Sequence, residues 1–174
     1  MKLLNKLIKK KMIKIQEIFS VPATKSSETL KAVYFVQLIK NMGLKAIVDI
    51  NGNIMVTKGK TKTYPTFCSH LDTVHSYKNG FNLIESEGIL SAQDNNGQQI
   101  GVGGDDVCGN YICFRLLEEL PSVKIVFFSR EESGGIGSSN IDTQFFNDSR
   151  FIGSIDRKGI QDFASQHGGT YRVS

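Results

Sequence analysis

The chain has 174 residues, of which 40% are hydrophobic and 22% charged, values that suit a globular domain with a real core. No apolar run reaches the roughly 20 residues of a membrane span, and the start lacks the cleavage site of a secretory signal. The net charge of +4 comes from six lysines within residues 1–14, and the rest of the chain is slightly acidic, which argues against a nucleic-acid-binding protein. Three cysteines without C-x-x-C spacing favour a reducing compartment, so we expect a cytoplasmic protein with all three thiols in or near its core.

The first part of the chain predicts two helices and a hairpin. A Lys-rich helix is expected over residues 3–18, and a second helix begins at Ser26-Ser27-Glu28 and ends at Gly43. The apolar face of the second helix is expected to comprise Leu30, Val33, Tyr34 and Leu38. Strands over 44–50 and 53–57 form a hairpin, for which Asn51-Gly52 predicts a type I′ turn.

From Pro65 onward, predicted strands and helices alternate. In chain order they are a strand over 65–69, a hairpin over 81–91 turned at Glu87-Gly88, a polar loop over 93–104, a helix over 108–120, a strand over 123–129, a Gly/Ser loop over 133–139, a short helix over 140–147 and a strand over 151–155. The strands over 123–129 and 151–155 are continuous apolar runs, typical of strands buried on both faces. This alternation predicts an α/β fold with a mixed, largely parallel sheet.

Polar residues that can bind metal follow several of these elements. His70, Glu131-Glu132 and Asp156 come directly after predicted strands, and Asp105-Asp106 lies where a loop enters a helix. Ligands of such sheets bind beyond the carboxyl ends of the strands, so we expect the four groups to meet at one edge. Each group alone has an ordinary explanation, such as a core histidine or a helix N-cap, but the ordered set matches the imidazole and carboxylate ligands of a two-metal hydrolytic site.

Four segments carry a resemblance to a known family. They are Ser69-His70-Leu71-Asp72-Thr73-Val74, Gly104-Asp105-Asp106-Val107-Cys108-Gly109, Arg130-Glu131-Glu132-Ser133-Gly134 and Ser154-Ile155-Asp156. In this order they are similar to the motifs of the di-zinc exopeptidase superfamily, which includes peptidase T, carboxypeptidase G and aminoacylase. The resemblance covers roughly residues 12–160. It implies a three-layer αβα catalytic domain over 1–174, with an N-terminal helix (1–18), a metallopeptidase core (19–160) and a tail (161–174).

The resemblance also implies roles for individual residues. His70 and Asp156 would bind one metal, Asp105 would bridge two metals, and Glu132 would bind the second. Glu131 would be the general base, and Asp72 would hydrogen-bond His70 and orient it. A cis peptide is expected at Asp105-Asp106. Zinc is the implied metal, with two ions expected, although cobalt and manganese suit the same ligands.

The chain departs from the family pattern at its final ligand, a histidine far downstream of Asp156. Only 18 residues follow Asp156, and His75 and His167 are weak substitutes. Position 107 is Val where the family motif has lysine. We therefore expect a C-terminally truncated or split member, with one metal site nearly complete, half of a second, and an exposed sheet edge.

Two functions remain open from the sequence. The first is a metal-dependent hydrolase that cleaves peptide or amide bonds of small peptides or N-acyl amino acids. The second is a non-catalytic metal-binding fragment or assembly module. The exposed edge would suit either a homo-oligomer or a complementing C-terminal segment. The sequence does not separate aminopeptidase, carboxypeptidase and deacylase activities.

Overall fold

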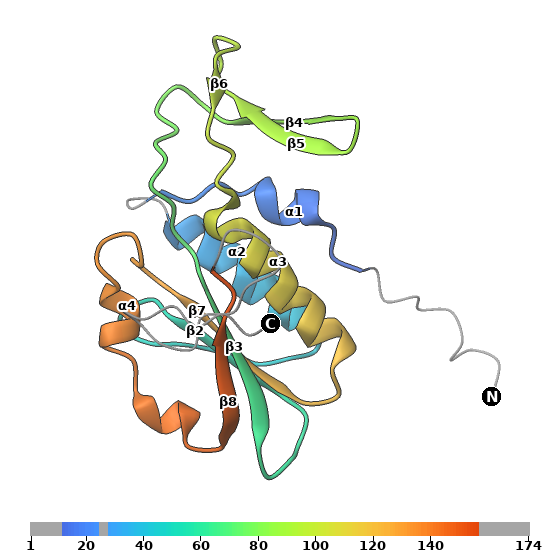
Figure 1. Cartoon of the computed structure of the whole chain (residues 1–174), viewed down its shortest axis with the longest axis vertical. Helices are drawn as coiled ribbons and strands as arrows, with labels where there is room; N and C mark the ends of the chain where they lie inside the picture. The colour runs from blue at the N-terminus through green and yellow to red at the C-terminus, as the bar shows by residue number, and fades with distance from the viewer. Residues whose placement is uncertain (1–11, 25–27, 157–174) are drawn as a thin grey trace, which may run out of the picture.

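A five-stranded mixed sheet forms the centre of the molecule (Figure 1). The computed structural model describes residues 12–24 and 28–156. The strands are β1 (Ala46–Val48), β2 (Ile54–Lys58), β3 (Tyr64–His70), β7 (Val123–Phe128) and β8 (Ser149–Ser154), and their order is β1-β2-β7-β3-β8. The strands β7, β3 and β8 run parallel, whereas β1, β2 and β7 pair antiparallel. The carboxyl ends of three neighbouring strands therefore lie at one edge of the sheet.

Helices cover both faces of this sheet, which confirms the predicted three-layer αβα architecture. On one face lie α2 (Glu28–Asn41) and α3 (Gly104–Glu119), and α1 (Ile15–Phe19) packs against α3. On the other lie α4 (Ile136–Ser139) and the 3-10 helix η2 (Thr143–Phe146). The alternation of β7 divides its side chains accordingly: Ile125 and Phe127 enter the larger core beneath α2 and α3, while Val126 enters a smaller one.

A second sheet of three strands lies at one end of the molecule (Figure 1). It comprises β4 (Asn82–Ser86), β5 (Ile89–Gln93) and β6 (Gln99–Ile100). The predicted turn at Glu87-Gly88 is confirmed, and both residues have positive φ, at 52° and 78°, as a type I′ turn requires. No helix within the described ranges is long and apolar enough to cross a membrane.

The buried face of α2 agrees with the predicted one only in part. Tyr34 and Leu38 pack against the core as predicted, but Leu30 and Val33 are exposed. The fully buried residues of this helix are Lys31, Phe35 and Ile39. These three residues follow the i, i+4, i+8 spacing of one helix face, but a lysine in the stripe conceals the pattern.

Two local predictions in the N-terminal half also need correction. The first helix is expected over 3–18, of which residues 3–11 lie outside the described residues; in the remainder, α1 begins only at Ile15 and ends at Phe19, with extended backbone at Lys14. The β1–β2 hairpin is present, but Gly52 N–H donates to the Asp49 carbonyl and, of the central pair expected, only Gly52 has positive φ. The type I′ assignment at Asn51-Gly52 is therefore wrong.

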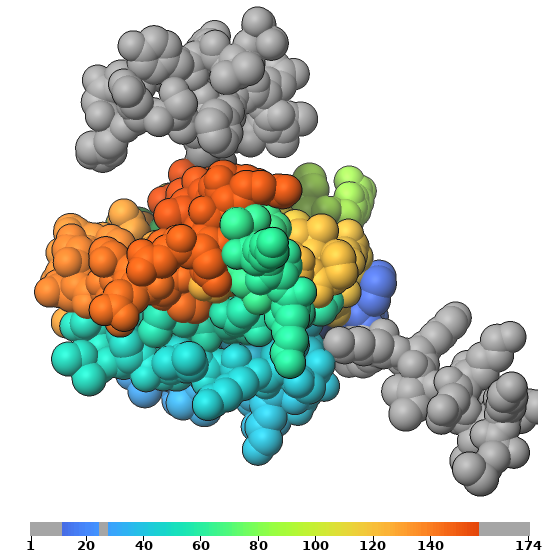
Figure 2. Space-filling model, turned by 90° about the horizontal axis from the view of Figure 1, so that it is seen from below, coloured from blue at the N-terminus to red at the C-terminus, as the bar shows by residue number. Residues whose placement is uncertain are grey.

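The prediction of a buried strand over 151–155 is wrong in its burial. Among the described strands β8 lies at one edge of the sheet, and its side chains Phe151 and Ile152 are exposed. Figure 2 shows the orange-red segment around β8 on the surface of this face. The predicted loop over 133–139 also ends in the short helix α4. Of the cysteines, two are buried as expected, but Cys108 is exposed.

Candidate metal centre

The sheet brings the predicted site residues together at the carboxyl ends of its parallel strands. His70 is the last residue of β3, and Glu131-Glu132 follows β7. Asp156 lies two residues beyond β8, and Asp105 lies in the first turn of α3. In the β3–β7 register, His70 pairs with Phe128, so both strands deliver their polar residues at the same level.

His70 lies at the centre of the group and is 2% exposed. Its Nε2 atom is 2.9 Å from Asp105 Oδ1 and 3.8 Å from Asp156 Oδ2. Potential ligand atoms of these three residues lie within 4.8 Å of one another, and the same holds for His70, Glu131 and Glu132. The four predicted carboxylate residues Asp105, Asp156, Glu131 and Glu132 therefore converge on the imidazole of the fifth predicted residue, His70.

The donor set fits a divalent metal ion such as zinc. Nδ1 of His70 is 3.0 Å from the backbone carbonyl oxygen of Asp72. A hydrogen bond to that oxygen requires the proton on Nδ1, so Nε2 faces the carboxylates of Asp105 and Asp156 and, once deprotonated, would offer its lone pair to a metal ion. An oriented neutral imidazole surrounded by carboxylate oxygens is a common zinc-binding arrangement. The assignment of each residue to a particular ion stays a prediction.

Asp72 binds the neighbouring loop through its side chain. Its buried carboxylate accepts hydrogen bonds from two consecutive backbone N–H groups, Glu131 at 2.9 Å and Glu132 at 3.1 Å. The Asp72 Oδ1 atom is 3.5 Å from His70 Nδ1, so the closer contact to the imidazole is made by the backbone carbonyl of Asp72. Asp72 thus joins the loops after β3 and β7 and fixes the backbone of both glutamates.

Asp106 is a buried part of the site that the sequence did not distinguish from an N-cap. Its Oδ2 accepts the His70 N–H at 3.2 Å, and its Oδ1 accepts the Gly109 N–H at 3.0 Å. Burial raises the pKa of Asp106 to about 7, although the Ser69 hydroxyl and His70 act in the opposite direction. The Asp105–Asp106 peptide bond is cis, as predicted.

The carboxylates of the site shift the pKa values of one another and of the His70 imidazole. Burial disfavours protonation of His70, but Asp72, Asp106, Asp156 and Glu131 outweigh it and raise its pKa to about 9. Burial, together with the charge of Asp105, raises the pKa of Asp156 despite His70. The surplus of negative charge around one imidazole makes this edge a strong attractor for cations.

The glycines near the site act mainly through backbone conformation. Gly134 and Gly135 have φ of 92° and 65°, and a Cβ atom at Gly134 would meet nothing within 4 Å. At Gly134 the positive φ, and not a close neighbour, therefore favours glycine. At Gly103, by contrast, φ is 77° and a Cβ atom would lie 2.9 Å from the Tyr77 hydroxyl.

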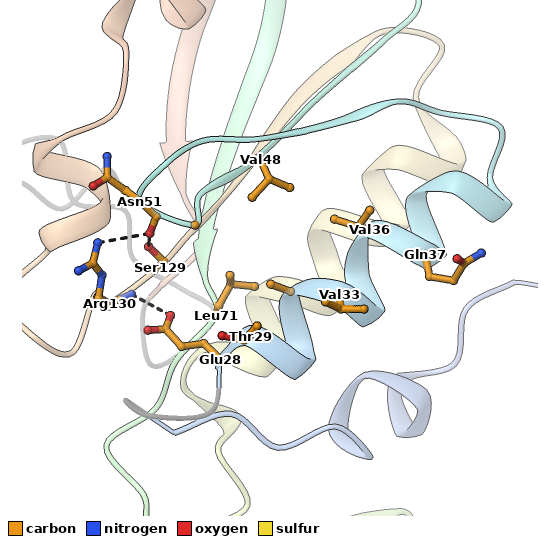
Figure 3. Close-up of a pocket in the computed structure, with 12 residues that line it drawn as sticks. Glu28, Thr29, Val33, Val36, Gln37, Val48, Asn51, Leu71, Ser129 and Arg130 are labelled. Atoms are coloured by element: carbon orange, nitrogen blue, oxygen red, sulfur yellow. Dashed lines mark hydrogen bonds between the residues drawn. The ribbon is translucent and has the colours of Figure 1, made fainter.

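A pocket of about 620 Å³ lies beside the metal centre, between α2 and the β1–β2 hairpin (Figure 3). It is lined by Glu28, Thr29, Ala32, Val33, Val36, Gln37, Val48, Asn51, Gly52, Leu71, Ser129 and Arg130. The Arg130 N–H donates to Glu28 Oε2 at 3.0 Å, which ties α2 to the loop that carries the glutamates. None of the five converging residues lines this pocket.

Of the two histidines considered as substitutes for the final family ligand, only His75 lies within the described residues. The ring of His75 packs over Gly101, where a Cβ atom would lie 2.2 Å from it, and it belongs to neither potential metal-binding group. His167 lies outside the described residues.

Comparisons with known proteins identify the fold. No model of a known protein family matches the chain, and no curated protein matches it. Among solved structures, aminopeptidase PepT from Bacillus cereus is similar at a TM-score of 0.70 and 22% identity, over 86% of this chain and 44% of that chain. The chain has the fold of this peptidase.

Two further structures have this peptidase fold. Aminoacylhistidine dipeptidase from Vibrio alginolyticus has a TM-score of 0.68 at 18% identity, over 85% of this chain and 34% of that chain. Human carnosine dipeptidase 1 has a TM-score of 0.63 at 16% identity, over 86% of this chain and 39% of that chain. The chain thus spans less than half the length of each of these three peptidases.

Proposed function

We propose that the chain forms part of a metal-dependent hydrolase that cleaves peptide or amide bonds of small substrates. The observation that carries this proposal is the convergence of His70 with Asp105, Asp156, Glu131 and Glu132 at the carboxyl edge of a peptidase fold. The three similar structures are those of an aminopeptidase and two dipeptidases, and the names of the latter two indicate dipeptide substrates. Small peptides and N-acyl amino acids are accordingly the substrates to test.

In this proposal the ligands divide between two ions. His70 and Asp156 would hold the first ion, Asp105 would bind both, and Glu132 would hold the second. Once bound, the ions would polarise the scissile carbonyl and lower the pKa of a water molecule. Since the described residues supply one histidine to these groups, we propose that a further segment or a second copy of the chain completes the second ion's ligands.

The protein's own groups perform the proton transfer. Glu131, whose backbone is fixed by Asp72 at 2.9 Å, takes the proton of the attacking water and gives it to the leaving amine nitrogen. The adjacent Glu132 is held separately by the other oxygen of Asp72, so one glutamate can act as base while its neighbour binds metal. The Asp72 carbonyl keeps the proton of His70 on Nδ1.

Glu131→Gln tests the base. We expect this variant to lower kcat on a panel of di- and tripeptides and N-acyl amino acids by about 10²- to 10⁴-fold, with its zinc content unchanged. Removal of metal by a chelator should abolish activity in the wild type, and added zinc should restore it. Glu85→Gln is the matched control, because Glu85 lies on β4 and contacts Gln16.

A specific observation supports a second candidate, a non-catalytic metal-binding module. The edge strand β8 leaves Phe151 and Ile152 exposed, as expected of a surface that associates with another chain. Both functions predict zinc binding through His70. Zinc-loaded protein that turns over no substrate of the panel would exclude the enzyme for this chain and leave the binding module.

A further inference from the structure

Lys31 is buried directly behind the candidate metal centre. It is 1% exposed, and it projects from α2 in the same stripe as Phe35 and Ile39. Lysine is almost never fully buried unless its charge is paired, because removing an ammonium group from water is costly. Its Nζ lies 5.8 Å from the centre of the Phe35 ring, a distance compatible with a cation–π contact.

The Lys31 ammonium group holds a backbone carbonyl that the sheet leaves unpaired. β3 ends at His70, so the next residue, Leu71, lies beyond the ladder. The N–H of Leu71 still donates to the Phe128 carbonyl at 2.8 Å, whereas its carbonyl accepts from Lys31 Nζ at 3.2 Å. A buried carbonyl without a partner would cost free energy, and this one stands between His70 and Asp72.

Two buried carboxylates lie close enough to act on Lys31. Burial lowers its pKa to about 8, while the charges of Asp106 and Asp72 act in the opposite direction. Neither carboxylate belongs to a potential metal-binding group. Both instead accept backbone N–H groups, those of His70 and Gly109 for Asp106 and those of the two glutamates for Asp72.

We propose that Lys31 is a positioning residue of the metal centre, which holds the Leu71 carbonyl and balances the buried charges of Asp72 and Asp106. It touches neither metal nor substrate. It acts through the two aspartates, which in turn hold the backbone of the imidazole ligand and of both glutamates. The proposal rests on the proposed function, since it takes His70 as a metal ligand.

The test compares Lys31→Met, which removes charge and donor, with Lys31→Gln, which keeps a neutral donor. The control is Lys124→Met, because Lys124 is also a buried lysine, pairs with Asp148, and lies near the start of β7, far from the strand's carboxyl end. Zinc and cobalt affinity are measured by competition with a chromophoric chelator. Loss of a positive charge near a cation site would by itself tighten binding, so weaker binding reports on positioning.

We expect Lys31→Met to weaken metal binding by about 10- to 100-fold, Lys31→Gln to weaken it less, and Lys124→Met to leave it unchanged. Hydrogen exchange of the metal-free proteins supplies a second readout. The amides of Leu71, Glu131 and Glu132 should exchange about tenfold faster in Lys31→Met than in the wild type or the control.

Unchanged or tighter metal binding together with unchanged exchange in folded Lys31→Met would overturn the proposal. If Lys31→Met does not fold, Lys31→Met/Asp106→Asn removes one buried charge of each sign. Recovery of folding in the double variant supports the charge balance, and failure of that variant overturns it. If the wild type binds no metal, the proposed function fails, while the exchange rates still decide the role of Lys31.

Discussion

The hydrogen bonds of Asp72 allow a sharp prediction for Asp72→Asn. Its two carboxylate oxygens accept from Glu131 N–H at 2.9 Å and Glu132 N–H at 3.1 Å. An asparagine has one acceptor oxygen, so one N–H would face an amide NH₂ group in a buried position. A hydrogen bond to a charged group is worth about 1.5–3 kcal/mol, and leaving its partner unpaired adds to the cost. We expect the free energy of unfolding to fall by about 2–4 kcal/mol and zinc affinity to fall by about 10- to 100-fold.

Asp94→Asn is the matched control for this prediction. Asp94 is also buried and accepts two backbone N–H groups, those of Asn96 and Gln98, but both bind the same oxygen, Oδ1, at 2.8 and 2.9 Å. An asparagine can keep that oxygen, so we expect a loss below about 1 kcal/mol and no change in zinc affinity. Urea unfolding of the metal-free proteins and zinc titration measure both quantities. Equal stability losses at the two positions would refute the reasoning.

Two further predictions concern the imidazole and the helix behind it. The raised pKa of His70, about 9 against 6.5, means that the folded metal-free protein binds this proton more tightly than the unfolded chain. This proton should contribute up to about 3 kcal/mol to the free energy of unfolding, and the contribution should be complete below pH 6.5 and lost as the pH rises through 9. The free energy of unfolding measured across this range should therefore fall with pH in the wild type and fall less in His70→Gln. An identical pH dependence in both proteins would contradict the assignment. Gly109→Ala places a Cβ atom 2.1 Å from the Ile155 carbonyl and 2.2 Å from Asp106 Oδ1, so stability should fall by about 1–3 kcal/mol despite a better helix propensity. A rise in its melting temperature would argue against this close packing.

The fold could be predicted largely from hydrophobic patterns, while the burial of individual elements could not. The apolar runs that became β7 and β8 look alike in sequence, yet Val126 is fully buried and Ile152 is exposed. Burial depends on neighbouring strands, and β8 lies at the edge of the sheet. The face of α2 could be predicted only in part for a similar reason, because Lys31 is buried only through groups that other elements bring to it.

The convergence of the site was predictable, but its internal connections were not. Strand ends and the order of the acids placed His70, Asp105 and Asp156 at one edge, and the distances from the imidazole agree. The sequence does not indicate that Asp72 binds the loop of Glu131, 59 residues away. Such a contact depends on the β3–β7 register, which no local pattern in the chain reveals.

That register has a consequence for how the chain could be altered. His70 lies opposite Phe128, and the polar residues of both strands follow at the same level. Shifting β7 by a single position would turn every side chain of that strand to the opposite face and move the glutamates away from Asp72, although every residue of the motifs would still be present. Lengthening the turn at Glu87-Gly88, between β4 and β5, leaves the strand pairing intact. We therefore expect the geometry of the candidate metal centre to be more sensitive to a one-residue deletion near Val123 than to a several-residue insertion in the second sheet.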